Sequence, residues 1–238
     1  MYFNMDGQVR YSEVDSKCNL TIDGVVNYLQ DTCMLHSEHC GVGLAHLKEH
    51  NTAWLLSSWQ IQILKVPRIY EKIQATTSPY EFKGFFGYRN FWIRNEAGEE
   101  MIRANSIWVY LDMEKQVPIR IPQEELDAYA PYMPKADMEY APRKMKLPTD
   151  FTPCEPIPVH LGMIDTNEHV NNCQYIKTAL EVAGLTELPR EIRAEYRKQA
   201  KVGDIFYPYL HRDEKEIVVD LRNAEGDSYA SVQFFAAE

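Results

Sequence analysis

The stretch "MIDTNEHVNNCQYI", residues 163–176, places an acid, an amide and an imidazole at every second position before a run of helix formers. In an extended segment, side chains two residues apart point the same way, so Asp165, Asn167 and His169 would share one side. On a helix, Asn167 would point away from the other two. The pattern therefore predicts an extended segment whose polar side chains line a site, followed by a helix.

The composition is that of an ordinary globular protein. The 238 residues contain 45% apolar side chains, which is enough for a packed core. The formal charge of -10, with no long basic run, argues against nucleic-acid binding. Five unpatterned cysteines and no apolar signal at the N-terminus predict a reduced, cytoplasmic setting. No apolar run approaches the roughly 20 residues that span a bilayer, so no membrane partner is expected.

Proline divides the chain unevenly, because nine of the thirteen prolines lie between residues 118 and 158. Such a segment cannot form a regular helix or a central strand. We therefore predict a linker over 113–155 that wraps over the surface, with one short helix around Gln123 to Tyr129. The predicted organisation is an N-terminal unit over 1–112, the linker, and a C-terminal unit over 156–238.

The two predicted units resemble each other. Adding 150 to early residue numbers aligns three pairs: Asp15 with Asp165, Asn19 with His169, and Leu20 with Val170. Further along, an offset of 128 pairs "RNEAGE" (94–99) with "RNAEGD" (222–227), each a glycine-containing turn between apolar strands. The sequence therefore predicts two copies of one supersecondary unit.

Each copy is predicted to contain one amphipathic helix followed by antiparallel strands. In the first copy, apolar positions recur at helical spacing and Gly41 can end the helix. In the second, Asn171 or Asn172 is a good N-cap and Gly184 closes the helix. The predicted buried stripes are Val25, Val26, Leu29, Cys33 and His36 in the first helix, and Cys173, Ile176, Leu180 and Ala183 in the second. A sheet curled around a helix, twice over, is an α+β architecture.

Two motifs relate the sequence to a known family. "DTNEHVNNCQY" (165–175) matches the pattern D-x-N-x-H-V-N-N-x-x-Y, and "EYRKQA" (195–200) follows it. On these motifs the chain resembles the acyl-acyl-carrier-protein thioesterases of the bacterial type, from about residue 8 to its end. The resemblance implies a double hotdog fold, in which two fused units each wrap an antiparallel sheet around a central helix. It also implies that the first hotdog supplies most of the acyl-chain pocket and the second the catalytic groups.

The resemblance places the family's aspartate, asparagine and histidine on Asp165, Asn167 and His169. The glutamate that plant members use falls on Gln199, and the adjacent cysteine once proposed as their nucleophile falls on Ala200. A catalytic cysteine at that position is therefore excluded. Glu195 is a poor replacement for the missing carboxylate, because four residues along a strand span roughly 13 Å.

Hydrolysis of a thioester needs a base for the water proton and hydrogen-bond donors for the oxyanion. His169 is the predicted general base, and Asp165 either orients the imidazole or activates the water itself. Asn167 is predicted to fix the water or the substrate carbonyl, and Gln199 to add one amide contact. Backbone N–H groups of Val170 and Asn171, at the start of the helix, are the predicted oxyanion donors.

Less specific interpretations of the same residues stay open. Asp165 and Asn167 also suit a turn that caps a helix, and His169 also suits a half-buried position. The resemblance assigns the first helix to the acyl-chain pocket, with Val25, Leu29 and Cys33 as lining residues, although core packing explains them equally well.

One helical spacing in the first copy suits metal ligands. Cys33, His36 and His39 recur three residues apart, but no fourth ligand is evident. No metal or redox cofactor is implied.

The predicted function is a cytoplasmic hydrolase of fatty acid biosynthesis that releases fatty acid from an acyl carrier protein with a phosphopantetheine-linked chain. An acidic carrier requires local positive charge on this acidic chain. The predicted docking residues are Arg193, Arg197, Lys198 and Lys201, with a second patch at Arg143, Lys144 and Lys146. Homodimerisation is possible for such a fold. Two rivals remain: a hotdog dehydratase of 3-hydroxyacyl thioesters, and a non-catalytic acyl-thioester binding module, which Gln199 keeps open.

Overall fold

The computed structural model describes residues 2–235. The chain divides into two compact units. Unit 1 contains Met1–Ser57 and Leu64–Tyr140, and unit 2 contains Ser58–Ile63 and Ala141–Glu238. The division falls inside the predicted linker, between Tyr140 and Ala141. Strand β2 (Thr52–Ile63) contributes residues to both units.

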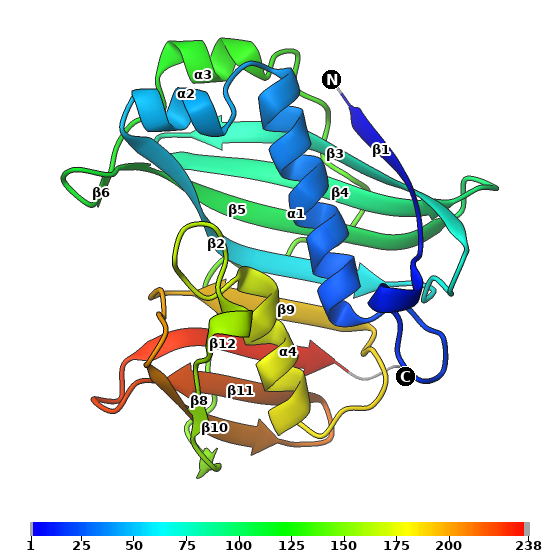
Figure 1. Ribbon diagram of the computed structural model, residues 1–238, viewed down its shortest axis with the longest axis vertical. Helices are drawn as coiled ribbons and strands as arrows, with labels where there is room; N and C mark the ends of the chain where they lie inside the picture. The colour runs from blue at the N-terminus through cyan, green and yellow to red at the C-terminus, as the bar shows by residue number, and fades with distance from the viewer. Residues whose placement is uncertain (1, 236–238) are drawn as a thin grey trace. The chain divides into compact units, whose positions relative to one another are not determined.

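Unit 1 is an antiparallel sheet with a long helix across one face (Figure 1). The strands lie in the order β1-β3-β4-β5-β2, and β6 pairs with β5. Their bounds are β1 (Phe3–Gln8), β3 (Lys72–Lys83), β4 (Phe86–Asn95), β5 (Glu100–Asp112) and β6 (Val117–Pro118). The helices are η1 (Tyr11–Glu13), α1 (Ile22–His39), α2 (Leu44–Glu49) and α3 (Gln123–Ala128). The short helix predicted around Gln123 is confirmed as α3.

Helix α1 forms where the spacing of apolar residues predicted it. The Thr21 hydroxyl accepts the N–H of Gly24 at 3.3 Å, which caps the N-terminus. The predicted stripe from Val25 to His36 is buried against the sheet. The helix ends at His39, and Gly41 follows in the left-handed conformation (φ 77°) that glycine adopts at little cost.

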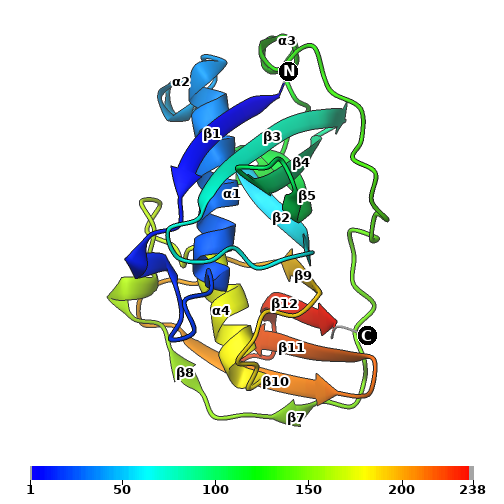
Figure 2. The same cartoon turned by 90° about the vertical axis from the view of Figure 1, so that its right-hand side faces the viewer.

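Unit 2 repeats this architecture with a shorter helix (Figure 2). Its strand order is β2-β9-β12-β11-β10-β7, and β8 pairs with β10. The bounds are β7 (Thr152–Pro153), β8 (Ile157–Pro158), β9 (Glu191–Tyr196), β10 (Ile205–Arg212), β11 (Glu216–Arg222) and β12 (Ser228–Phe235). The helices are η2 (Leu161–Met163) and α4 (Asn172–Val182). The residues of β2 that belong to unit 2 pair with β9, from Ser58 opposite Glu195 to Gln62 opposite Glu191.

Helix α4 begins and ends as predicted. The Asn171 side chain accepts the N–H of Cys173 at 3.1 Å, so Asn171 is the N-cap. Gly184 follows the C-terminus with φ 62°. Of the predicted stripe, Cys173, Ile176 and Ala183 are buried and Leu180 is half-buried.

The two copies share their hairpin turns. In unit 1, the Asn95 N–H donates to Glu99 O at 3.1 Å, and Gly98 has φ 80°. In unit 2, the Asn223 N–H donates to Asp227 O at 2.8 Å, and Gly226 has φ 90°. Glycine suits both positions because a positive φ strains residues with a Cβ. The matching turns support the predicted duplication.

Candidate active site

Residues 165–169 form a tight turn, so the predicted extended segment is wrong. The N–H of Asp165 donates to the carbonyl of His169 at 2.8 Å, and the N–H of Glu168 donates back to Asp165 O at 3.2 Å. The Asp165 Oδ1 atom accepts the N–H of Asn167 at 2.8 Å. A short acidic side chain that captures a backbone N–H two residues on favours a turn over a strand. The polar trio therefore lies on one turn and not along an extended segment.

Unit 1 contains the same turn without the imidazole. Asp15 Oδ1 accepts the N–H of Lys17 at 2.8 Å, and the Asp15 N–H donates to Asn19 O at 2.9 Å. The aspartate therefore builds the turn in both copies. Asn19 occupies the place of His169, so the backbone geometry of this turn does not require a histidine there.

The side chain of His169 has an unusual environment. Its Nδ1 atom is buried and has no hydrogen-bond partner among residues 2–235. Burying a polar atom without a partner costs about 1–3 kcal/mol, so each such atom in a native protein requires an explanation. A ring nitrogen whose partner is supplied by substrate or water fits that requirement, and imidazole is the commonest general base in enzymes.

Gln199 lies on a segment next to the motif turn. The N–H of Val170 donates to Ala200 O at 2.9 Å, which brings the chain at Gln199 beside the chain at His169. The N–H of Ala200 donates to the Tyr175 hydroxyl at 2.8 Å, so a side chain of α4 holds this segment. Burial raises the pKa of Tyr175, which keeps the hydroxyl protonated. Gln199 itself is exposed.

Tyr175 is a positioning residue that the sequence reasoning did not identify. The signal was present, because this tyrosine is the last letter of the D-x-N-x-H-V-N-N-x-x-Y pattern. The separation of 25 residues between Tyr175 and Ala200 concealed their contact.

The predicted oxyanion donors need a correction. The N–H of Val170 is already bonded to Ala200 O, and the N–H of Asn171 donates to Met163 O at 2.9 Å. Both residues precede α4, and their N–H groups complete the pairing that leads the chain into the helix. Backbone N–H groups buried in this way take protein partners, so neither is available for an oxyanion.

Glu195 does not replace the missing glutamate. It is buried, and its Oε2 atom accepts the N–H of Met145 at 2.8 Å. On the same strand Tyr196 points toward α4, where its hydroxyl donates to Asn172 O at 3.0 Å. Because successive side chains of a strand alternate, Glu195 lies on the sheet face away from α4.

Two of the predicted docking residues, Arg193 and Arg197, pair with acidic residues of unit 2. Arg193 Nε donates to Glu191 Oε1 at 2.7 Å. Arg197 lies 3.2 Å from the Glu195 carboxylate and donates to Ser231 Oγ at 2.8 Å. Their positive charge is thus largely neutralised inside the unit.

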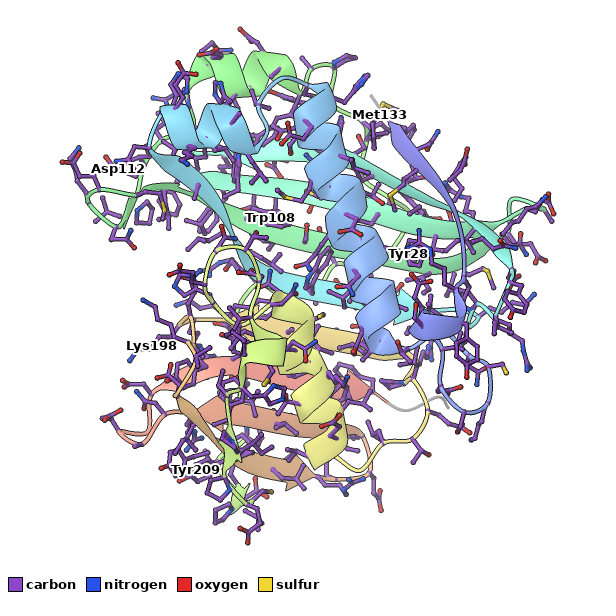
Figure 3. The ribbon with its side chains drawn as sticks, viewed as in Figure 1. Tyr28, Trp108, Asp112, Met133, Lys198 and Tyr209 are labelled. Carbon is purple, nitrogen blue, oxygen red and sulfur yellow. The ribbon has the colours of Figure 1, made fainter. Side chains whose placement is uncertain are left out.

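The two predicted docking lysines are more available. The side chain of Lys198 is 52% exposed and projects from the ribbon (Figure 3), with its nearest carboxylate oxygen, on Asp227, 3.5 Å away. Lys201 is exposed. The four residues therefore do not form one free basic patch.

The predicted acyl-pocket residues lie in unit 1. Val25, Leu29 and Cys33 are all buried on the sheet-facing side of α1. Burial raises the pKa of the Cys33 thiol. These observations fit a chain-lining role and core packing equally.

His36, the second residue of the metal alternative, already has a partner. Arg89 Nη1 lies 2.7 Å from Nδ1 of His36. Burial, with the Arg89 charge, lowers the pKa of His36 to about 3, so the ring is neutral and Nδ1 accepts from the guanidinium. His39 is exposed.

Family models match both parts of the chain. The acyl-ACP thioesterase N-terminal domain matches residues 1–129, and the corresponding C-terminal domain matches residues 149–234. The chain belongs to the acyl-ACP thioesterase family. The motifs that carried the resemblance thus led to the correct family.

Curated relatives are plant proteins. A chloroplastic palmitoyl-acyl carrier protein thioesterase from Gossypium hirsutum is 26% identical over 216 residues, which cover 84% of this chain and 52% of the relative. A chloroplastic oleoyl-acyl carrier protein thioesterase from Arabidopsis thaliana is 25% identical over 250 residues, covering 94% of this chain and 66% of the relative. The chain spans about half the length of the first of these relatives.

Solved structures of the acyl-ACP thioesterase family share the fold. An acyl-ACP thioesterase from Bacteroides thetaiotaomicron superposes with a TM-score of 0.89 at 22% identity, covering 98% of this chain and 97% of that one. The 12:0-ACP thioesterase from Umbellularia californica gives 0.83 at 16% identity, covering 98% and 96%. The predicted α+β double hotdog fold is confirmed.

Proposed function

We propose that this protein hydrolyses acyl thioesters carried on an acyl carrier protein and releases the free fatty acid. Membership of the acyl-ACP thioesterase family supports this reaction class. The observation that carries the proposal is the buried, unpartnered Nδ1 of His169, on a turn whose copy in unit 1 has no imidazole.

In the proposed reaction His169 takes a proton from a water molecule as the water oxygen attacks the thioester carbonyl carbon. The tetrahedral intermediate collapses with cleavage of the carbon–sulfur bond. The imidazolium then returns the proton to the leaving thiolate, so the histidine acts first as base and then as acid. Ala200 stands where a cysteine nucleophile would be needed, which agrees with direct attack by water.

Asp165 has two functions in this scheme. Its Oδ1 atom builds the turn through the N–H of Asn167. Its Oδ2 atom has no hydrogen-bond partner in the part of the chain that the structure describes, and we assign it to orient the imidazole or the water. Asn167 and Gln199, both exposed, would contact the water or the substrate carbonyl through their amides.

The proposed partner is an acidic acyl carrier protein. Lys198 and Lys201 are the docking residues that we retain, because both are exposed and Lys198 pairs with the exposed Asp227, whereas Arg193 and Arg197 pair with more buried carboxylates of unit 2. The acyl chain is assigned to the α1 side of unit 1, along Val25, Leu29 and Cys33. None of the helices within residues 2–235 is long and apolar enough to cross a membrane, and the cytoplasmic setting remains a proposal.

The decisive variant is His169→Asn, because Asn19 shows that asparagine is compatible with this turn. We expect thiol release from acyl carrier proteins of several chain lengths to fall about 10²- to 10⁴-fold, with an unchanged melting temperature. Substitution of Lys177, in helix α4 that follows the turn, by Ala is the control. Undiminished thiol release by the asparagine variant would contradict the mechanism.

The non-catalytic alternative rests on Gln199, which replaces a carboxylate of the plant proteins. If it were correct, the wild-type protein would bind an acylated carrier without releasing thiol, and Gln199→Glu would confer turnover. Turnover by the wild type removes this alternative. Mass analysis of the acyl product identifies a dehydratase, because that reaction leaves an enoyl thioester and no free thiol.

A further inference from the structure

Two histidines and two glutamates of unit 1 meet where α2 lies beside α3 (Figure 1). His46 lies in α2, and His50 caps the C-terminus of that helix. Glu124 and Glu125 form part of the first turn of α3. Possible ligand atoms of His46, His50 and Glu124 all lie within 4.8 Å of one another. These residues are outside the motif turn and have no part in the proposed hydrolysis.

The contact between His46 and Glu125 is unusual for a buried ion pair. His46 Nε2 and Glu125 Oε1 are 3.3 Å apart, yet Oε1 has no hydrogen-bond partner and is buried. Glu125 is only 1% exposed. A buried carboxylate oxygen without a donor is costly, and the positive charge of a cation bound to His46 would offset that cost.

The surrounding contacts prepare these groups as ligands. His50 Nδ1 lies 2.8 Å from the carbonyl of His46, so a proton on Nδ1 is held there and Nε2 is left with its lone pair. Trp54 Nε1 donates to Glu125 Oε2 at 3.3 Å, and Glu125 Oε1 lies beside His46 Nε2. Fixing a ligating histidine through a carboxylate or a carbonyl at its second nitrogen is the usual outer-shell arrangement of metal sites.

We propose that His46, His50 and Glu124 form a binding site for a divalent transition metal of the zinc class, with Glu125 as the outer-shell partner of His46. Imidazole nitrogen and carboxylate oxygen are zinc ligands at about 2.0–2.2 Å. The set supplies two nitrogens and one carboxylate, and nothing softer than imidazole, which leaves the fourth position of a tetrahedral site to water.

The metal would have a structural role, because the site joins two six-residue helices that are too short to be stable alone. Leu47 of α2 forms a small apolar cluster with Tyr110 and Ile121, and Leu126 of α3 packs against it. A metal ion bridging α2 and α3 would hold them over this cluster and stabilise unit 1 by mass action.

A second group of similar residues in unit 2 lacks this character. Both ring nitrogens of His211 lie near carboxylates, Nδ1 at 3.1 Å from Asp150 and Nε2 at 3.6 Å from Asp213. Asp213 Oδ1 also accepts the N–H groups of Lys215 and Glu216. The imidazole and the carboxylates of this second group already have protein partners, so the group gives no reason to propose a cation.

Zinc chloride titrated into chelator-treated protein, followed by calorimetry, tests the proposal. We expect one equivalent to bind, and His50→Ala and Glu124→Gln to weaken binding at least about tenfold. Both residues are exposed, so the variants should fold. His39→Ala removes an exposed histidine outside the cluster and should bind as the wild type does. Zinc should raise the melting temperature of the wild type and of His39→Ala, but not of His50→Ala.

The absence of zinc binding to the wild type would overturn the site. Equal binding by His50→Ala and Glu124→Gln would also overturn it, because it would assign the ion to other groups, such as the free cysteines. Thioesterase activity is not the measured quantity, so the outcome is independent of the proposed function.

Discussion

Asp165 and His169 stand at the two ends of a five-residue turn, joined by a 2.8 Å hydrogen bond from the Asp165 N–H to the His169 carbonyl. Asp15 and Asn19 are joined in the same way at 2.9 Å in the other unit. The chain therefore contains an internal control for the candidate active site. The aspartate and the turn hydrogen bond, which both copies have, serve the fold. The imidazole, which only the second copy has, is available for chemistry.

This comparison predicts different outcomes for one substitution made at two places. Asp165→Asn keeps a side-chain oxygen for the N–H of Asn167 but loses the negative charge. We expect thioester hydrolysis to fall about 10²-fold or more, with little change in stability. Asp15→Asn makes the same change in unit 1 and should leave hydrolysis within twofold of the wild type. Equal effects in steady-state assays would show that the charge of Asp165 serves only the turn.

Removing the hydroxyl of Tyr175 tests whether the segment at Gln199 must be held in place. Tyr175→Phe leaves the buried N–H of Ala200 without its acceptor, at a cost of about 1–3 kcal/mol in the free energy of unfolding. We expect kcat to fall as well, because the segment beside His169 loses an anchor. Urea denaturation and steady-state kinetics measure the two effects.

Tyr28→Phe is the matched control for this variant. The Tyr28 hydroxyl of α1 (labelled in Figure 3) donates to Glu13 Oε2 at 2.9 Å and to Gln8 O at 3.0 Å. Its loss should lower stability to a similar extent while kcat is retained. If kcat of Tyr175→Phe also matched the wild type, Tyr175 would be a purely structural residue.

The stability of the protein should depend on pH through His36. Burial and the charge of Arg89 lower the pKa of His36 from 6.5 to about 3. Below pH 6.5 the unfolded chain therefore binds a proton that the folded protein does not. The contribution of the neutral ring is fully present above that pH and decreases as pH falls toward 3, by up to about 1.4 kcal/mol per unit.

His36→Gln keeps an acceptor for Arg89 and removes the titrating group. The difference in unfolding free energy between wild type and variant, measured in urea from pH 7.5 to 4.5, should shrink or reverse as pH falls. Leu35→Gln changes an exposed position of the same helix and no titrating group, so it should show a constant difference from the wild type. A His36→Gln difference that is also independent of pH would refute the buried neutral ring.

Local sequence was sufficient for much of the fold. The caps of α1 and α4, the glycines after them, and the turns at Asn95 and Asn223 depend on contacts within a few residues. Such contacts leave a direct signal in the order of residue types. The duplication could be recognised in the sequence for the same reason, since two copies of one unit need the same turn residues at the same offset.

The conformation of the motif was not predicted correctly, although its residues were named. Alternation of polar residues suggested an extended segment, whereas the Asp165 side chain bonds to its own backbone and forms a turn. The pairing with Asp15 was already visible in the sequence and pointed to the same backbone role.

By itself, the sequence determined the two helix-and-sheet units, their caps and turns, and the identity of the polar trio, because each is specified by neighbours along the chain. Only the tertiary structure decided that the N–H of Val170 donates to Ala200 O and that Glu195 lies on the sheet face away from α4. It also decided that His46 meets Glu125 from a different helix. These outcomes depend on which distant groups the folded backbone brings within hydrogen-bonding or coordination distance, and no local pattern encodes that.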